Sequence, residues 1–207
     1  SVLGLDGKSQ QIVSCDDKVK LLKYAGADEV RILSFDKALS TTEPEDFFKT
    51  VVLDDLKAGS LAVGYDFRFG NKGRGDVGLL GKLCPEAGVK LLIMGELLMS
   101  GIRISSSEIR RRIASGDSTG AAMMLGRMHA FRTRLDKGLL VPERGYVLPP
   151  VGLRFRTALL SELPLDEDIP ELDGEAVLAE GAGQAWFEDA PAPDSEGLRY
   201  LVYGPCK

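Results

Sequence analysis

The sequence predicts an α/β fold in which a parallel sheet is followed by a small antiparallel sheet or barrel. Up to about residue 125, apolar or β-branched runs alternate with amphipathic segments, which is typical of parallel strands joined by crossover helices. From about Thr133 the helical periodicity disappears, prolines accumulate and short alternating runs follow. We therefore expect two domains, at residues 1–130 and residues 131–207.

Local signals place the expected elements. Apolar or β-branched runs predict strands of the first domain at residues 1–6, 29–35, 60–64 and 88–94. Acidic first turns, N-capping side chains, a first-turn proline and closing glycines predict its helices at residues 16–26, 45–57, 77–84, 106–115 and 118–125. Alternating runs predict strands of the second domain at residues 145–148, 153–160, 175–179, 184–188 and 198–203.

Composition narrows the class of protein. The net charge of -5 argues against a protein whose main partner is a nucleic-acid backbone, so any anion site must be local. Three widely spaced cysteines without a CxxC pair suggest neither a disulfide framework nor a zinc site, which fits a reducing cytoplasm. A single histidine, His129, excludes a metal site built from several histidines. No apolar run approaches the roughly 20 residues that span a bilayer, so no membrane partner is expected.

The stretch Ile104–Arg112 contains the first candidate binding feature. Ser105 and Glu108 have the spacing of a capping box, which predicts a helix start near Ser106. The outward amides of a first helical turn, the positive end of the helix dipole and a nearby arginine suit a phosphate group. A well-capped surface helix with solvated arginines fits the same residues, and the stretch alone leaves both interpretations open.

A second candidate follows the expected strand at residues 60–64. Asp66 and Arg68 flank Phe67, so on an extended backbone they share one side while Phe67 and Phe69 face the other. Glycines at positions 70, 73 and 75 let the backbone approach a ligand closely, among cations at positions 68, 72 and 74. An aromatic ring beside cations suits a planar ring joined to phosphates. A solvated basic loop with packed phenylalanines is the alternative.

These stretches have the order and spacing of a known family's motifs: Val63–Gly70, Gly73–Asp76, Ile104–Arg110 and Leu125–Arg127. Between about Asp16 and Arg127 the chain resembles the bacterial bifunctional riboflavin kinase/FAD synthetase family, specifically its FMN adenylyltransferase module. The resemblance implies a Rossmann-like nucleotidyltransferase domain that transfers AMP from ATP to FMN, giving FAD and pyrophosphate with Mg²⁺.

The resemblance also implies roles for particular residues. The ATP phosphates would be bound by Ser105, Ser106, Ser107 and Arg110, with Ser106 and Arg110 as the catalytic groups. Flavin and nucleotide would be bordered by Gly64, Asp66, Phe67, Arg68, Phe69 and Asn71. No metal ligand is expected from the protein itself. The expected partners are ATP and FMN/FAD, and the oligomeric state is left open.

The sequence lacks two motifs of the family, and smaller departures lie at Ser100, Ser107 and Glu108. The family's HxGH loop is absent, and Ser1–Asp6 resembles the family's second strand, so we expect the first strand and the histidine loop to lie outside the printed sequence or to be lost. The family's Gly-x-Pro-Thr-Ala-Asn kinase signature is also absent, so residues 131–207 are expected to form a degenerate riboflavin-kinase-like barrel without kinase activity.

Three hypotheses about function follow. The first is an FMN adenylyltransferase. The second is a non-catalytic flavin or adenine-nucleotide binder that kept the pocket and lost the chemistry, and the third is a relative that acts on another phosphorylated acceptor. All three require the serine-led helix start and the aromatic-arginine stretch to meet at one groove.

Overall fold

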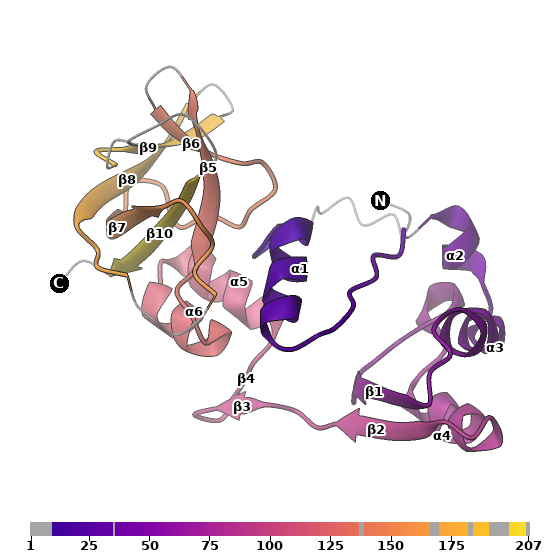
Figure 1. Ribbon diagram of the computed structural model, residues 1–207. Helices are drawn as coiled ribbons and strands as arrows, with labels where there is room; N and C mark the ends of the chain where they lie inside the picture. The colour runs from indigo at the N-terminus through magenta and orange to yellow at the C-terminus, as the bar shows by residue number, and fades with distance from the viewer. Residues whose placement is uncertain are drawn as a thin grey trace. The chain divides into compact units, whose positions relative to one another are not determined.

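The computed structural model describes residues 10–34, 36–136, 139–165, 170–181, 184–190 and 199–205 (Figure 1). These residues form two compact units, each with its own core. The first unit contains residues 31–101, and the second contains residues 10–30 together with residues 102–205. The boundary predicted at residue 130 divides the chain by the expected type of secondary structure, not by compactness. This boundary stays a prediction.

A parallel βαβ arrangement forms the centre of the first unit. Strands β1 (Ser60–Gly64) and β2 (Lys90–Met94) pair in parallel, and helix α4 (Val77–Glu86) connects them. Asp76 begins α4, because its carboxylate accepts a hydrogen bond from the Leu79 amide at 2.9 Å. The predicted parallel pairing with a crossover helix is therefore confirmed.

Helical segments complete the first unit. They are α2 (Lys37–Thr41), α3 (Pro44–Phe47), the π-helical η1 (Phe48–Asp55) and the short 3₁₀ turn η2 (Asn71–Gly73). Pro44 occupies the first turn of α3, where its missing amide hydrogen is not needed. The side chains buried between these helices, β1 and α4 include Phe48, Val52, Val63, Leu80 and Cys84.

Two expectations for this part of the chain are wrong. Residues 29–34 do not form a strand, since β-branched composition favours a strand only where a partner strand accepts its hydrogen bonds. Strand β2 is not buried either: Leu92, Ile93 and Met94 are 58%, 45% and 51% exposed. The expected strand at residues 1–6 lies outside the described residues.

Six antiparallel strands of the second unit close into a barrel (Figure 1). In the order in which they pair, they are β10 (Arg199–Pro205), β5 (Ala130–Asp136), β6 (Leu139–Pro142), β9 (Gln184–Glu188), β8 (Gly174–Gly181) and β7 (Arg154–Leu160). The pairing of β7 with β10 closes the ring. This confirms the predicted small antiparallel barrel. The expected strand at residues 145–148 is replaced by a single bridge between Gln11 and Tyr146.

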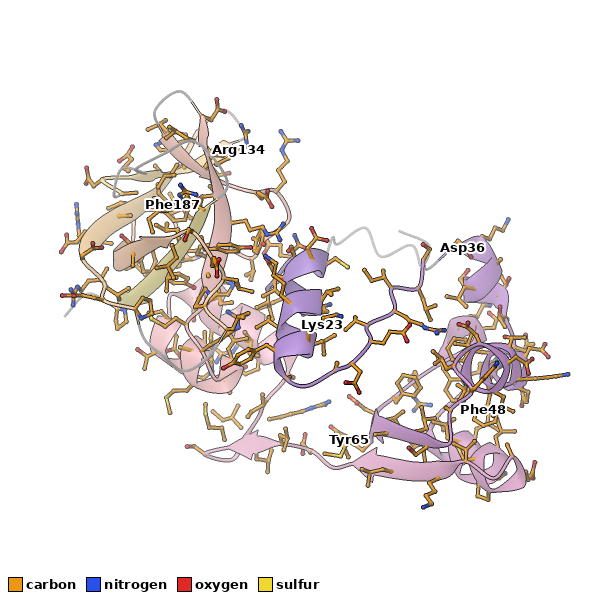
Figure 2. The ribbon with its side chains drawn as sticks, in the orientation of Figure 1. Lys23, Asp36, Phe48, Tyr65, Arg134 and Phe187 are labelled. Carbon is orange, nitrogen blue, oxygen red and sulfur yellow. The ribbon has the colours of Figure 1, made fainter. Side chains whose placement is uncertain are left out.

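Aromatic side chains fill the barrel. Phe131 stacks on Tyr203 with ring centroids 5.1 Å apart, and Phe155 meets the same tyrosine edge-on. Phe187 lies among the barrel strands, whereas Phe48 lies on the helical segment of the first unit (Figure 2). Each unit therefore has its own aromatic core.

Three helices accompany the barrel in the second unit: α1 (Cys15–Tyr24), α5 (Ser106–Ser115) and α6 (Ser118–Leu125). The short strands β3 (Leu98–Met99) and β4 (Ile102–Arg103) lead the chain from the first unit into α5. Gly116 and Gly126 end α5 and α6 in the left-handed conformation, as their positions predict. None of the helices in the described ranges is both long enough and apolar enough to cross a bilayer.

Candidate functional site

The serine turn before α5 forms only half of the predicted capping box. Ser105 Oγ accepts a hydrogen bond from the Glu108 amide at 3.2 Å, so α5 begins at Ser106. The Glu108 carboxylate instead accepts hydrogen bonds from Arg111 and Arg112 at 2.6–2.9 Å. Hydrogen bonding from Arg111 is the main cause that lowers the pKa of Glu108 to about 2. By their position, the first amides of α5 have no acceptor within the helix and suit an external anion.

A pocket of about 440 Å³ lies beside this turn. Ser106 and Arg110 of α5 line it, together with Lys18 of α1 and Arg127, which follows α6. Arg110 Nε donates to the backbone carbonyl of Gln10 at 2.6 Å, which orients the guanidinium. The apolar part of the lining includes Ile12, Leu21, Ile109, Leu125 and Leu165. We call this the cationic pocket.

Arg127 is 7% exposed and lies beside the cationic pocket. Its Nη1 donates to the Met128 carbonyl at 2.9 Å, and no carboxylate of the described chain lies within ion-pair distance of it. Burial lowers the pKa of Arg127, and the more distant Asp17 partly offsets this effect. A buried guanidinium with only a carbonyl partner is costly, and a bound anion would compensate it.

The first unit contains a cavity of about 690 Å³ with an aromatic wall. The rings of Phe67 and Phe69 stack with centroids 5.7 Å apart and 16° between their planes, and Phe47 tilts against Phe69 at 5.8 Å. Arg68 and Lys72 also line this aromatic cavity. Phe67 is 37% exposed, so part of its ring is open to a ligand.

Two glycines fix the shape of the loop that carries these rings. Gly70 has φ +69°, and a Cβ there would lie 2.6 Å from the Pro44 Cα. A Cβ on Gly75 would lie 2.7 Å from the Phe69 ring, and the two residues exchange backbone hydrogen bonds at 2.9 and 3.1 Å. Only glycine satisfies both positions, which gives a physical reason for the glycine-rich sequence.

Ionic contacts anchor the same loop. Asn71 Nδ2 donates to Glu43 Oε1 at 3.1 Å, and Arg74 pairs with the other oxygen of Glu43. The Asn71 hydrogen bond is the main cause that lowers the pKa of Glu43. Arg68 Nη1 lies 3.3 Å from Asp76 Oδ2, so the carboxylate that caps α4 also holds the arginine.

The predicted site residues fall into two groups in the structure. Those that line a cavity are Phe67, Arg68 and Phe69 in the first unit and Ser106 and Arg110 in the second. Those outside these linings are Gly64, Asp66, Asn71, Ser105 and Ser107. The predicted residues from Gly64 to Asn71 belong to the first unit and those from Ser105 to Arg110 to the second, so their convergence on one groove stays a prediction. Ser105 follows β4, which pairs with β3 and not with the strands of the parallel sheet.

Sequence reasoning gave no site role to several lining residues, among them Lys18, Arg127 and Phe47. Lys18 reaches the cationic pocket only because α1 packs in the same unit as α5, a contact between distant segments that no local pattern signals. Arg127 belongs to the motif Leu125–Arg127, to which the sequence analysis assigns no binding role. Phe47 packs against the core of the first unit and also lines the aromatic cavity, a double role that its sequence context does not signal.

His129 is 1% exposed and belongs to the barrel unit. Its Nε2 lies 2.9 Å from the Ile12 carbonyl, and its ring meets that of Phe131 edge-on. Burial is the main cause that lowers the pKa of His129 to about 3, so the ring is neutral at neutral pH. This histidine therefore supplies no charge to a phosphate.

Comparison with known proteins shows a match to the FAD synthetase family over residues 1–108. The "Bifunctional riboflavin kinase/FMN adenylyltransferase" of Escherichia coli (strain K12) is 31% identical over 161 residues, which cover 72% of this chain and 51% of the relative. The protein of the same name from Pseudomonas fluorescens is 30% identical, covering 88% and 54%. The "FAD synthetase" of Listeria monocytogenes is 29% identical, covering 66% and 55%. The chain thus spans about half the length of these curated relatives.

A solved structure also has this fold. The "Crystal Structure of Macrolide-efflux Protein from Streptococcus pneumoniae" matches with a TM-score of 0.75 and 18% identity, covering 98% of this chain and 75% of that chain. At this identity the likeness concerns the fold alone.

An α/β unit with a parallel βαβ arrangement, together with a closed antiparallel barrel, defines a protein of the α/β-plus-barrel fold class. The family match covers more than half of the chain and agrees with this architecture. The chain belongs to the FAD synthetase family.

Proposed function

We propose that this chain carries out the FMN adenylyltransferase reaction, in which AMP moves from ATP to FMN and yields FAD and pyrophosphate. The observation that carries the proposal is the cationic pocket beside Ser106 and Arg110, in a chain of the FAD synthetase family. The names of the relatives from Escherichia coli and Listeria monocytogenes describe this activity, which supports the same assignment.

The second unit would bind the phosphates. The first-turn amides of α5 and the guanidinium of Arg110 would stabilise the charge that develops on the ATP phosphates, and Lys18 and Arg127 would add positive charge. An oxygen of the FMN phosphate attacks the α-phosphorus in line, and the bond from that phosphorus to pyrophosphate breaks. The FMN phosphate is already ionised, so the reaction needs positioning and charge neutralisation rather than a general base.

Mg²⁺ is part of the proposal through ATP. Among the described residues that line the cationic pocket there is no carboxylate, so this pocket fits a phosphate-bound Mg²⁺ better than one held by protein side chains. When bound, the metal neutralises charge on the phosphates. The protein's own contribution there is the set of cations and amides around Ser106.

The first unit would bind a planar ring. The rings of Phe47, Phe67 and Phe69 offer stacking surface, and Arg68 and Lys72 offer positive charge for an attached phosphate. A flavin and an adenine both have this combination of ring and phosphate. We assign the flavin ring of FMN to the aromatic cavity and the ATP phosphates to the cationic pocket.

The riboflavin kinase activity in the relatives' names is not proposed, because the printed sequence lacks the Gly-x-Pro-Thr-Ala-Asn signature. A cytoplasmic location is proposed, and the free thiols of Cys15 and Cys84 are compatible with a reducing compartment.

Incubation of the protein with ATP, Mg²⁺ and FMN tests the proposal directly. Chromatography should detect FAD and pyrophosphate in equal amounts. Tight binding of FMN and ATP without FAD would instead identify a non-catalytic binder. Transfer of AMP to a different phosphorylated acceptor, with FMN left unchanged, would overturn the choice of substrate but keep the reaction class.

A further inference from the structure

The second unit contains another cavity, of about 560 Å³, whose lining shares only Gly126 and Arg127 with the cationic pocket. Residues of α6, β7 and β10 line it. Two arginines, Arg127 and Arg156, contribute to the lining, and no carboxylate does so among the described residues. The apolar part of the lining includes Ala122, Met123, Met128, Leu172 and Pro205. We call this the barrel-end cavity.

One residue of this lining, Ser118, has a buried hydroxyl without a partner. Ser118 is 5% exposed, and its Oγ has no hydrogen-bond partner. Buried polar groups in folded proteins are nearly always hydrogen-bonded, so an unpaired hydroxyl beside a cavity indicates a place for a missing acceptor or donor. The neighbouring Thr119 lines the same cavity.

Within the described part of the chain, the two arginines donate to backbone carbonyls. Arg127 donates to the Met128 carbonyl, and Arg156 donates to the Leu172 carbonyl. Neither guanidinium has a carboxylate at ion-pair distance within the described chain. Each guanidinium has five N–H donors in a planar fork that matches the oxygens of a phosphate. Among the described residues, the positive charge of these two arginines therefore has no carboxylate partner, and it lies next to apolar surface.

We propose that the barrel-end cavity binds a small organic phosphomonoester, with its phosphate at Arg156 and Ser118 and its apolar body against Met123, Met128 and Leu172. A cavity of this size holds one small molecule rather than a polymer. Arg156 and Ser118 do not line the cationic pocket, so this site is distinct from the proposed nucleotide site. Arg127 lines both.

Phenyl phosphate is a suitable probe, with phenol as its uncharged counterpart. The chain has five methionines, of which Met123 and Met128 line the cavity. In protein labelled with ¹³C at the methionine methyl groups, phenyl phosphate should shift these two signals saturably. The signals of Met94, Met99 and Met124 should stay in place, because these residues are not in the lining. Equal binding of phenol would show an apolar patch only and would overturn the phosphate assignment.

Substitutions of single residues test whether Arg156 and Ser118 bind the phosphate. Arg156→Gln should weaken phenyl phosphate by about tenfold or more, since it removes a charge-assisted hydrogen bond, and Ser118→Ala by about fivefold. Arg154→Gln is the matched control, because Arg154 lies on the same strand, pairs with Glu175 at 3.2 Å and does not line the cavity. If Arg156→Gln does not fold, the affinity of Ser118→Ala for phenyl phosphate still tests the proposed site. Affinity unchanged in Ser118→Ala, or lowered equally by Arg154→Gln, would overturn the proposal.

The measurement is also independent of the proposed transferase activity. Methyl shifts report binding without turnover, so a protein that makes no FAD can still show this site. Arg110→Ala removes a cation from the cationic pocket only, and the phenyl phosphate shifts should persist in that variant. Their loss in Arg110→Ala would place the probe in the cationic pocket instead.

Discussion

Asp17 and Arg132 are joined at two points. Arg132 Nε donates to Asp17 Oδ2 at 2.8 Å, and Arg132 Nη2 donates to Oδ1 at 2.7 Å. The hydroxyls of Tyr200 and Ser14 donate to the same carboxylate, each at 2.8 Å. Asp17 is 1% exposed, so its charge is compensated entirely by the protein. The pair attaches α1 to the barrel wall and thereby places Lys18, the next residue, at the cationic pocket.

Asp17→Asn should destabilise the protein by about 3–5 kcal/mol, because Arg132, whose side chain is only 12% exposed, loses its close carboxylate partner and keeps only the more distant Asp16. Urea unfolding at pH 7 measures this loss. Asp16→Asn is the control: the Asp16 side chain is 76% exposed and lies 3.6 Å from Arg132, so its removal should cost at most about 1 kcal/mol. Equal effects of the two substitutions would contradict the assigned role of the buried pair.

Two buried groups, His129 and Asp17, should make the free energy of unfolding depend on pH. The folded-state pKa of His129 is about 3, below its ordinary value of 6.5, mainly because of burial. Between these values the unfolded chain binds a proton that the folded chain does not, so stability falls as the pH decreases from 6.5 towards 3. The slope should reach about 1.4 kcal/mol per pH unit.

The second group is Asp17. Burial raises its pKa, but the hydrogen bonds from Arg132, Tyr200 and Ser14 outweigh burial and leave the pKa below 3.8. Its contribution is therefore complete above pH 3.8 and is lost as the pH falls through the lower folded-state pKa. Unfolding experiments from pH 7 to 4 should show a slope that His129→Gln removes and that Asp16→Asn retains. A slope that persists in His129→Gln would mean that another group titrates.

The sequence predicted local structure well and long-range contacts poorly. Ser105, Asp76 and Gly116 form their helix ends as expected, because caps depend on interactions within a few residues. Residues 29–34 failed as a strand, because a strand depends on a partner that local sequence does not specify. Arg127 and Lys18 were missed as site residues for the same reason: only the packing of distant segments brings them to one pocket.

Arg110 and Arg111 are neighbours on α5, but only Arg110 lines the cationic pocket. Arg110→Ala should weaken ATP by about 1.5–3 kcal/mol if Arg110 donates to a phosphate. Arg111→Ala should leave ATP affinity within about 0.5 kcal/mol, since Arg111 pairs with Glu108 and does not line the pocket. Isothermal titration with a non-hydrolysable ATP analogue measures both. Similar losses in the two variants would indicate a diffuse charge effect, with no specific phosphate contact at Arg110.

The shape of the aromatic cavity depends on Gly75, which does not itself line the cavity. Gly75→Ala places a Cβ 2.7 Å from the Phe69 ring, so the ring must move and its stacking with Phe67 is disturbed. FMN affinity should fall by about tenfold, while ATP affinity at the cationic pocket should stay unchanged. Gly81→Ala is the control, because a Cβ there meets nothing within 4 Å. Flavin fluorescence quenching measures FMN binding, and wild-type FMN affinity in Gly75→Ala would remove this cavity from the flavin site.

Two buried threonines of the barrel should respond in opposite ways to the same substitution. Thr133 and Thr157 are both fully buried, but Thr133 Oγ1 donates to the Arg199 carbonyl at 3.2 Å whereas Thr157 Oγ1 has no partner. Thr157→Val removes an unpaired hydroxyl at nearly constant volume and should stabilise the protein by about 1–2 kcal/mol. Thr133→Val breaks a hydrogen bond and leaves a carbonyl short of a donor, so it should destabilise by about 1–3 kcal/mol. Thermal unfolding of the two variants decides the matter, and a loss of stability in Thr157→Val would show that its hydroxyl is satisfied in the folded protein.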